Sequence, residues 1–268
     1  MKNKVHTQTN QYFKYTKFFM NIKNELKNFY DNEAKKYHQT RQKPRTDWKR
    51  ILDEIEKSWK KEVKILEFWC GWGRCIKYLE KNLKWIKINY TWVDISNELL
   101  KFAKKDNPKH KFICDDISNY ITDIPQESYD FIIWIASFQH IPTQWEKIFL
   151  MKHFYRTLKY WGKIIMINWS LSKRFLKKFK KTIINSFLKC IITLWKHKRR
   201  NLSIPWKNWW ETKKRFYHIF SISELETLTK EWWFLIDKLT YIDKSWQEIV
   251  DRKKSNNTIL IWAKNIFI

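Results

Sequence analysis

The feature that most constrains the fold is a strand–turn–helix pattern in the segment KILEFWCGWGRCIKYLE, residues 64–80. An apolar run, Val63–Phe68, is followed by two glycines and then by apolar residues at helical spacing. Glycine has no Cβ, so its backbone can take positive φ and approach a ligand. A turn of this kind lies at the carboxyl end of a strand, where open α/β sheets bind ligands. The pattern predicts an α/β fold whose nucleotide-type cofactor contacts Gly71 and Gly73.

The second feature is an apparent exchange of glycine for tryptophan. The chain of 268 residues has 3 glycines and 18 tryptophans. Average glycine use of about 7% would give roughly 19 glycines, close to the two counts together. Several tryptophans follow helical segments, as glycine does, among them Trp59, the pair 209–210 and the pair 232–233. We hypothesise that the gene encodes glycine with UGA, and that reading UGA as tryptophan gives this sequence. The alternative is a genuinely tryptophan-rich protein.

Some tryptophans are expected to be genuine under either hypothesis. Trp206 lies in the segment SIPW, Trp169 follows an expected strand, and Trp48 opens an expected helix. The recoding hypothesis therefore concerns the tryptophans in turns rather than all of them.

Charge and cysteine content narrow the possible partners. The net charge is +27, from 54 Lys and Arg against 27 Asp and Glu, so the surface should attract nucleic acid or anionic lipid. The alternative is codon bias, because lysine, asparagine and isoleucine are abundant throughout. Cys70, Cys75, Cys114 and Cys190 show no CxxC spacing, so we expect neither a metal nor a disulfide framework. No leader or apolar run of ~20 residues occurs, so we expect a cytoplasmic protein without a transmembrane segment.

Five motifs resemble those of class I S-adenosylmethionine (SAM) methyltransferases and occur in that family's order. They are EFWCGWGR, YTWVDIS, FICDDIS, YDFIIWIASFQHI and LKYWGKIIMI, within roughly residues 61–167. Trp69, Trp92 and Trp161 stand where that family carries glycine. The resemblance implies an α/β, Rossmann-like fold with a seven-stranded, mostly parallel sheet, helices on both faces, and SAM as cofactor.

The resemblance also assigns a cofactor site. Its expected members are Arg41, Glu67, Cys70, Gly71, Gly73, Asp94, Ile95, Asp116, Ile117 and Ala136. Glu67 would orient the turn or reach the methionine amino group. Asp94, closing the second strand, would accept from the ribose hydroxyls, although a carboxylate there could instead cap the next helix. Asp116 would accept from the adenine amino group, with Asp115 as the alternative, and Ile117 would form the wall under the ring.

Residues 1–60 are expected to form a helical lid in front of a methyltransferase domain, residues 61–268. We expect helices over Ile22–Lys36 and Asp47–Lys57, with residues 1–21 as a tail or a short helix. SAM enzymes commonly close such helices over the cofactor. Tyr37 and Arg41 would then cover its methionine part, the arginine by pairing with the carboxylate. The alternative for that arginine is a solvated side chain.

An insertion is expected at about residues 170–215. Its segment RFLKKFKKTIINSFLKCIITLWKHKRR has basic ends and an apolar middle with helical spacing. Three interpretations remain open: a helix that contacts RNA phosphates, an interfacial membrane helix, and a helix packed on the domain.

The flanks carry a narrower resemblance, to the tRNA wobble-uridine carboxymethyl methyltransferases. The similar segments are YDNEAKKYHQTRQKP, SIPW and KKRFYHIFSISELETL. The resemblance implies methyl esterification of a carboxymethyl group on tRNA, with a small activating protein as a possible partner. Arg215, Tyr217 and His218 become the candidates for substrate binding, the alternative being a packed hairpin edge.

No compelling catalytic acid or base is found. His140, after the fourth expected strand, is a weak candidate that could equally be structural. A carboxylate acceptor is already charged, so catalysis can depend on positioning in a dry site. Two other functions stay open: a small-molecule methyltransferase of the same fold, and a non-catalytic RNA-binding protein if the tryptophans are genuine.

Overall fold

The computed structural model describes residues 2–42, 48–193, 198, 200–207, 212–232, 234–245 and 247–265, with the backbone alone for 2–20 and 207. Asp47 and the tryptophans at 209, 210 and 233, which entered the sequence-based predictions, lie outside these residues.

The central sheet has eight strands in the order β3-β2-β1-β4-β5-β10-β8-β9. The first five run parallel, whereas β10 is antiparallel to both β5 and β8. The strands are β1 (Glu62–Phe68), β2 (Lys87–Asp94), β3 (Lys111–Cys114), β4 (Tyr129–Ile135), β5 (Leu158–Trp169), β8 (Phe234–Ile242), β9 (Glu248–Ile249) and β10 (Asn257–Lys264). The predicted count of seven was wrong, because the two residues of β9 pair with the end of β8 as an eighth, edge strand.

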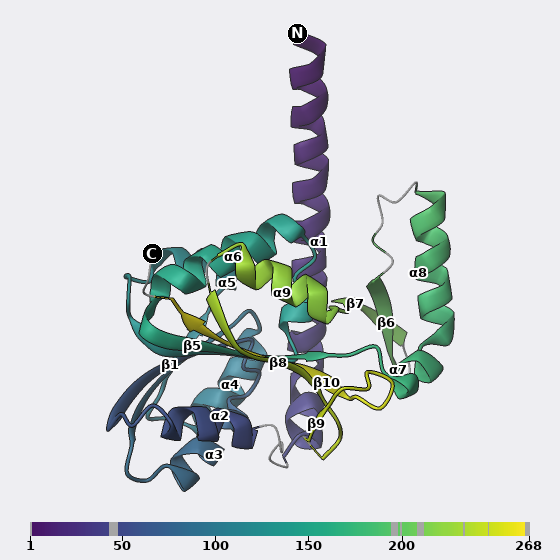
Figure 1. Cartoon of the computed structure of the whole chain (residues 1–268). Helices are drawn as coiled ribbons and strands as arrows, with labels where there is room; N and C mark the ends of the chain where they lie inside the picture. Colours follow the sequence, from purple (N-terminus) through teal and green to yellow (C-terminus); the bar gives the residue numbers. More distant parts are fainter. Residues whose placement is uncertain are drawn as a thin grey trace.

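Helices cover both faces of this sheet (Figure 1). Those on one face are α5 (Ile117–Asp123), α6 (Gln144–Thr157) and α9 (Ile222–Lys230); those on the other are α2 (Trp48–Glu56), α3 (Arg74–Asn82) and α4 (Asn97–Asp106). Successive strand residues point to opposite faces, so Leu66 packs in the core with α6 and α9 while Ile65 packs in the core with α2 and α3. The predicted Rossmann-like fold is confirmed.

A single helix, α1 (Lys2–Thr40), replaces the separate tail and shorter helix that the sequence suggested. Its C-terminal half packs on the domain through buried Ile22, Leu26 and Phe29, which recur at the three- and four-residue spacing of one helix face. Its N-terminal part extends beyond the domain in Figure 1. Only the packed C-terminal half of α1 can therefore contribute residues to a site on the domain.

The predicted insertion contains α7 (Lys173–Lys178), α8 (Lys180–Ile192) and a separate hairpin of β6 (Asn201–Lys207) with β7 (Thr212–His218). Phe175, Leu202 and Tyr217 form a small core that joins α7 to this hairpin. The chain then enters α9 through a capping box of Ser221 and Glu224.

Residues 159–162 lie within β5, which pairs irregularly with β4 at this point. Trp161 has φ +62°, and a Cβ on Gly162 would lie 2.8 Å from the Lys159 carbonyl oxygen. The residue that adopts the left-handed conformation is thus the tryptophan, whereas the glycine is required by close packing.

Candidate cofactor and substrate site

The turn after β1 has the backbone that the sequence predicts. Gly71 and Gly73 have φ of +61° and +72°, and Gly73 precedes the first turn of α3. A Cβ on Gly73 would lie 3.1 Å from the Trp92 ring. Trp69, two residues earlier, also has positive φ, at +49°. The turn therefore places three left-handed residues beside the start of a helix, where free N–H groups favour an anionic or polar ligand.

Asp94, at the end of β2, is buried against this turn. Its carboxylate accepts hydrogen bonds from the backbone N–H groups of Gly71 and Ser96, both at 2.9 Å. Burial raises the pKa of Asp94 to about 7. The side chain that caps α4 is Ser96, which accepts from the Leu99 N–H. The carboxylate thus joins the ends of two strands, as a ribose-binding residue would need to do.

Glu67 lies beside it and is also buried. It accepts from the indole N–H of Trp92 at 2.8 Å and from the Tyr90 hydroxyl at 3.2 Å. Burial raises the pKa of this carboxyl to about 7 as well. Two neighbouring buried carboxyl groups with raised pKa values make this turn a candidate functional site.

At the far end of the site, the Asp116 side chain caps α5 by accepting from the Ser118 N–H at 2.7 Å. It also pairs with Lys23 of α1, whose ammonium group reaches Glu146 as well. A hollow here is lined by Asp115, Asp116 and Ile95. Ile117, the predicted adenine wall, is instead fully buried in the core.

A cavity of about 80 Å³ lies between α1 and the sheet, below the range of roughly 300–1,000 Å³ that is usual for small-molecule sites. Among the predicted cofactor residues, its lining includes Glu67, Cys70, Gly71, Asp94, Ile95 and Ala136. Leu26, Tyr30 and Tyr37 cover it from α1, so this helix lies where the sequence analysis expected a lid.

Arg41 lies at the end of α1 beside that lid. Its guanidinium is 4.1 Å from the Tyr37 ring centre and 5.1 Å from that of Trp206. Its carbonyl oxygen accepts from Arg74 at 3.0 Å. Arg74 also lines the cavity, as does Tyr30, and sequence reasoning missed both. The place of Arg74 directly after Gly73 was the signal that could have identified it.

Arg215, on β7, is the most unusual charged group near the cavity. It is 6% exposed and donates to the Tyr30 hydroxyl at 2.9 Å. Its guanidinium lies 4.7 Å from the Trp206 ring centre, and Phe29 and Tyr217 also surround it. Its Nε is buried without a hydrogen-bond partner, and it forms no ion pair with a carboxylate among the described residues. A buried cation with an unused donor is suited to an anionic ligand.

His140, in the short helix η1 (Phe138–His140), lies between the cavity and this arginine. Its ring packs on Tyr217 and Trp69, and Nδ1 is 2.7 Å from the Phe216 carbonyl oxygen, to which it donates. Burial lowers the pKa of His140 to about 3, so the ring is neutral at pH 7. The group can position its neighbours, but its low basicity disfavours proton abstraction.

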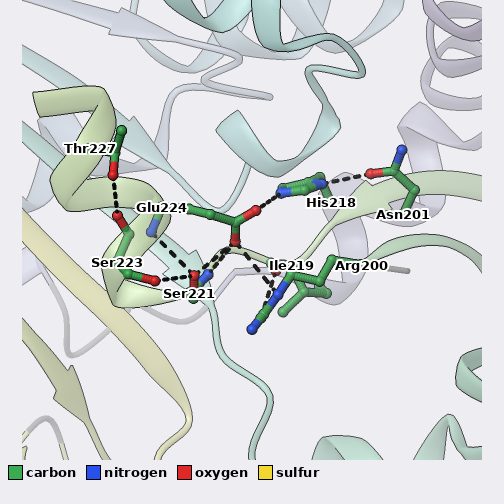
Figure 2. Close-up of polar contacts among 8 residues, drawn as sticks. All are labelled: Arg200, Asn201, His218, Ile219, Ser221, Ser223, Glu224 and Thr227. Carbon is green, nitrogen blue, oxygen red and sulfur yellow. Dashed lines mark hydrogen bonds and ion pairs between the residues drawn. The ribbon is translucent and has the colours of Figure 1, made fainter. Parts of the chain in front are cut away.

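His218 points elsewhere (Figure 2). Its ring nitrogens face Asn201 at 2.6 Å and Glu224 at 3.2 Å, so it fastens the β6–β7 hairpin to α9. Burial lowers its pKa to about 4. Arg215 and Tyr217 occupy alternate positions of β7 and share a face, whereas His218 lies on the other. The structure thus brings together two of the three predicted substrate residues.

No helix in the described part of the chain is long and apolar enough to cross a membrane. Within the same residues, no group of three His, Cys, Asp or Glu side chains could hold a metal ion.

An open, mostly parallel sheet with a glycine turn after β1 and a carboxylate closing β2 is typical of folds that bind a nucleotide-type cofactor. Residues 65–162 match a protein family described as a methyltransferase domain. This match to part of the chain supports the predicted enzyme class, a methyltransferase with SAM as cofactor.

Solved structures with this fold include a SAM-dependent methyltransferase of Methanosarcina mazei, with 20% identity, 78% of this chain and 96% of that chain covered, and a TM-score of 0.60. A TehB-like SAM-dependent methyltransferase from Corynebacterium glutamicum has 13% identity, coverage of 89% and 98%, and a TM-score of 0.55. The 1,6-didemethyltoxoflavin-N1-methyltransferase of Burkholderia thailandensis, with bound S-adenosylhomocysteine, has 11% identity, coverage of 92% and 90%, and a TM-score of 0.59. A comparison with curated proteins finds no match.

Proposed function

We propose that this enzyme transfers the methyl group of SAM to a carboxylate oxygen of a carboxymethyl group on the wobble uridine of tRNA. The observation that carries the proposal is Arg215, a buried guanidinium with an unused Nε–H and no carboxylate partner among the described residues. Its hydrogen bond to Tyr30, which lines the cavity, connects it to the cofactor site.

The carboxyl groups present fit the hydroxyl and amino donors of SAM, whereas the Trp69 indole lines the same small cavity. Asp94 would hold the ribose hydroxyls, Glu67 the methionine end and Asp116 the adenine end, because each offers a carboxylate to hydroxyl or amino donors around one cavity and its adjoining hollow. SAM supplies an electrophilic methyl group on its sulfonium when bound.

Arg215 would pair with the acceptor carboxylate and fix one oxygen towards the cavity. The carboxylate needs no deprotonation, which agrees with a neutral His140 that donates to the Phe216 carbonyl. The surrounding rings, among them Trp206 and Tyr217, would exclude water and hold the guanidinium in place. Catalysis is then a matter of position rather than of proton transfer.

The RNA part of the proposal is supported by charge and by ring chemistry. A net charge of +27 favours binding to a phosphate backbone. Tyr217 stacks on Trp169 at 4.8 Å beside Arg215, but it is 2% exposed, so a base could stack there only after the side chains that cover it move.

A small carboxylic acid is the second candidate acceptor. The similar methyltransferase from Burkholderia thailandensis has a small molecule, 1,6-didemethyltoxoflavin, bound in its structure, and its fold covers 92% of this chain. The buried position of Arg215 suits a small acid as well as a nucleoside.

The test is transfer from methyl-labelled SAM to bulk tRNA, followed by nucleoside analysis. We expect an alkali-labile methyl ester on one modified uridine. Arg215→Met should reduce transfer at least a hundredfold while SAM affinity changes less than threefold. Lys214→Met is the matched control, since it removes an exposed cation from the same strand and should keep activity. Full activity in Arg215→Met, or label only in small acids, contradicts the tRNA proposal.

We further propose that several tryptophans are glycine in the natural protein. Among the described residues, five that are not glycine have positive φ, and three of them are Trp59, Trp69 and Trp161. A left-handed conformation costs such a residue about 1–2 kcal/mol but costs glycine almost nothing.

The indole nitrogens support the same proposal. Those of Trp69, Trp72, Trp134, Trp232 and Trp262 are buried without a hydrogen-bond partner. Each such group costs about 1–3 kcal/mol. The same is true of Trp206, which we expect to be genuine, so this observation is weaker than the backbone conformation. Trp48 and Trp169, also expected to be genuine, contact the rings of Tyr78 and Tyr217. Trp92 differs from both groups, because it is buried and donates to Glu67.

Mass spectrometry of the natively expressed protein tests this directly on the tryptic peptide Ile65–Arg74. We expect glycine at positions 69 and 72. Tryptophan at both positions would end the recoding proposal, whatever the outcome of the methyl-transfer assay.

A further inference from the structure

Helix α8 presents an apolar face that the domain does not cover. Ile184, Phe187, Leu188, Ile191 and Ile192 are between 45% and 79% exposed. They are spaced as i, i+3, i+4, i+7 and i+8, which places them on one side of the helix. Scattered apolar side chains are normal on a surface, but a continuous stripe of this size indicates a binding face.

The opposite face of α8 is the one that packs. Cys190 and Ser186 are buried, and the Ser186 hydroxyl donates to the Asn201 carbonyl oxygen at 2.7 Å. Figure 1 shows α8 at the edge of the molecule, with β6 and β7 on one side only. The apolar stripe therefore faces outward and is not part of the insertion's own core.

The charge around the stripe has one sign. Residues 170–200 contain eleven Lys and Arg and no Asp or Glu. Lys177 and Lys178 on α7, and Lys180, Lys181 and Lys189 on α8, are exposed. None of these five forms an ion pair with another described residue. An occupant must therefore accept both aliphatic side chains and several positive charges.

We propose that α8 is an interfacial helix that docks this enzyme on a membrane surface rich in anionic lipid. The aliphatic side chains would enter the boundary between headgroups and acyl chains, and the lysines would extend to the phosphates. The 13 residues of α8 span roughly 20 Å, which suits a helix lying in the interface and is too short to cross a bilayer.

The other occupants fit less well. A second copy of the chain would bring two cationic faces together, which like-charge repulsion opposes. RNA would satisfy the lysines, but isoleucine and leucine cannot stack on bases as aromatic rings do, so the stripe would stay in water. An acidic amphipathic protein helix is the closest competitor. The observations favour lipid because the stripe lies on the outer side of a helix at the edge of the molecule and is flanked by lysines without a carboxylate in residues 170–200.

The experiment is co-sedimentation of the full chain with vesicles of phosphatidylcholine alone and of phosphatidylcholine with phosphatidylserine. We expect at least tenfold stronger binding to the anionic vesicles. The pair Ile184→Ser and Leu188→Ser should reduce this binding at least tenfold, and so should the pair Lys177→Gln and Lys181→Gln. Val250→Ser is the control, because Val250 is 98% exposed on the loop between β9 and β10 and should bind as the unchanged chain does.

Several results would overturn the proposal. They are absence of binding to anionic vesicles, unchanged binding in the Ile184 and Leu188 pair, self-association that this pair abolishes, and binding of an acidic amphipathic peptide without binding of vesicles. Circular dichroism and SAM affinity, which should match those of the unchanged chain, verify that the variants fold. Methyl transfer to tRNA in solution should be unchanged in all of these variants. A failure of the membrane proposal can therefore be distinguished from a failure of the proposed methyltransferase function.

Discussion

At the residue scale, the candidate site is built from ionisable groups that the fold holds away from water. Asp94 and Glu67 are buried carboxyl groups whose pKa values are raised to about 7 by that burial. Arg215 is a buried cation enclosed by rings. Such groups cost folding free energy unless a ligand uses them, which is why they distinguish the site from the rest of the surface.

The first prediction concerns Asp94. A ribose hydroxyl donates to a carboxylate better than to a carboxylic acid, so SAM affinity should rise between pH 6 and pH 8 as this group ionises. Asp94→Asn should lower affinity about tenfold at pH 8, roughly 1.4 kcal/mol, and flatten the pH dependence. Calorimetric titration measures both. Asp123→Asn, an exposed change, should behave as the unchanged chain, and an equally steep pH profile in Asp94→Asn would contradict the assignment.

The second prediction concerns Trp69 in the recombinant chain with the sequence shown. Trp69→Gly should be more stable than Trp69→Ala by about 1 kcal/mol, because only glycine relieves the left-handed strain at φ +49°. Urea unfolding measures the difference. Trp48→Ala, which empties a buried site, should instead cost about 3–5 kcal/mol. Equal stability of the two Trp69 variants would remove the backbone argument for glycine.

At the element scale, the hairpin β6–β7 depends on α9 for its position. The polar contacts in Figure 2 run from Asn201 through His218 to Glu224, which also completes the capping box with Ser221. Burial lowers the pKa of His218 to about 4, and contacts with His218 and Ser221 hold that of Glu224 near 2 against a burial effect of opposite sign. The Asn201 oxygen and the Glu224 carboxylate both face ring nitrogens as acceptors, so a neutral ring donates to one of them only.

The third prediction is the pH dependence of this contact. Between pH 6.5 and pH 4 the unfolded chain protonates His218 whereas the folded chain does not, so folding stability should fall as the pH is lowered through this range. His218→Gln should lose less stability than the unchanged chain, by roughly 2 kcal/mol between pH 6.5 and pH 5. Urea unfolding at several pH values measures it. His140 is present in both the unchanged chain and His218→Gln, so its contribution to the pH dependence cancels in the comparison. Identical pH profiles of the two proteins would show that His218 is not buried as a neutral ring.

At the scale of the whole molecule, the overall charge is positive, whereas the cavity is lined by acidic groups. The net charge of +27 gives a positive field around the protein, while the cofactor cavity beneath α1 is lined by the buried carboxyl groups of Glu67 and Asp94. Tyr30 of α1 contacts Arg215, 185 positions away in sequence, and Lys23 of α1 reaches Asp116. Helix α1 therefore contacts both the hairpin that carries Arg215 and the hollow beside Asp116.

The fourth prediction follows from that field. Affinity for tRNA should fall by a factor of about 10³ or more between 50 and 200 mM salt, since binding releases counterions from the phosphates. SAM affinity should change less than threefold over the same range, because its site is enclosed. Filter binding and calorimetry measure the two. A tRNA affinity that does not depend on salt would favour the small-acid acceptor.

The sequence alone determined those features that depend only on residues close together in the chain. Local backbone preference and hydrophobic period predict strand β1, the turn with Gly71 and Gly73, and the acidic residue that closes β2. The predicted and observed bounds therefore agree within a few residues. The capping box at Ser221 is local in the same way. Side chains alternate between the two faces of a strand, so the sequence could also have shown that His218 and Arg215 lie on opposite faces. We grouped them because they belong to one motif.

Only the tertiary structure decided the remaining features. The extent of α1, the pairing of β9, the burial of Ile117 in the core and the encounter of Tyr30 with Arg215 depend on which distant surfaces pack together. A side chain's role follows from its partners, and partners more than a hundred positions apart leave no local pattern. Whether an arginine is solvated or buried with an unused donor is therefore settled by packing, not by composition.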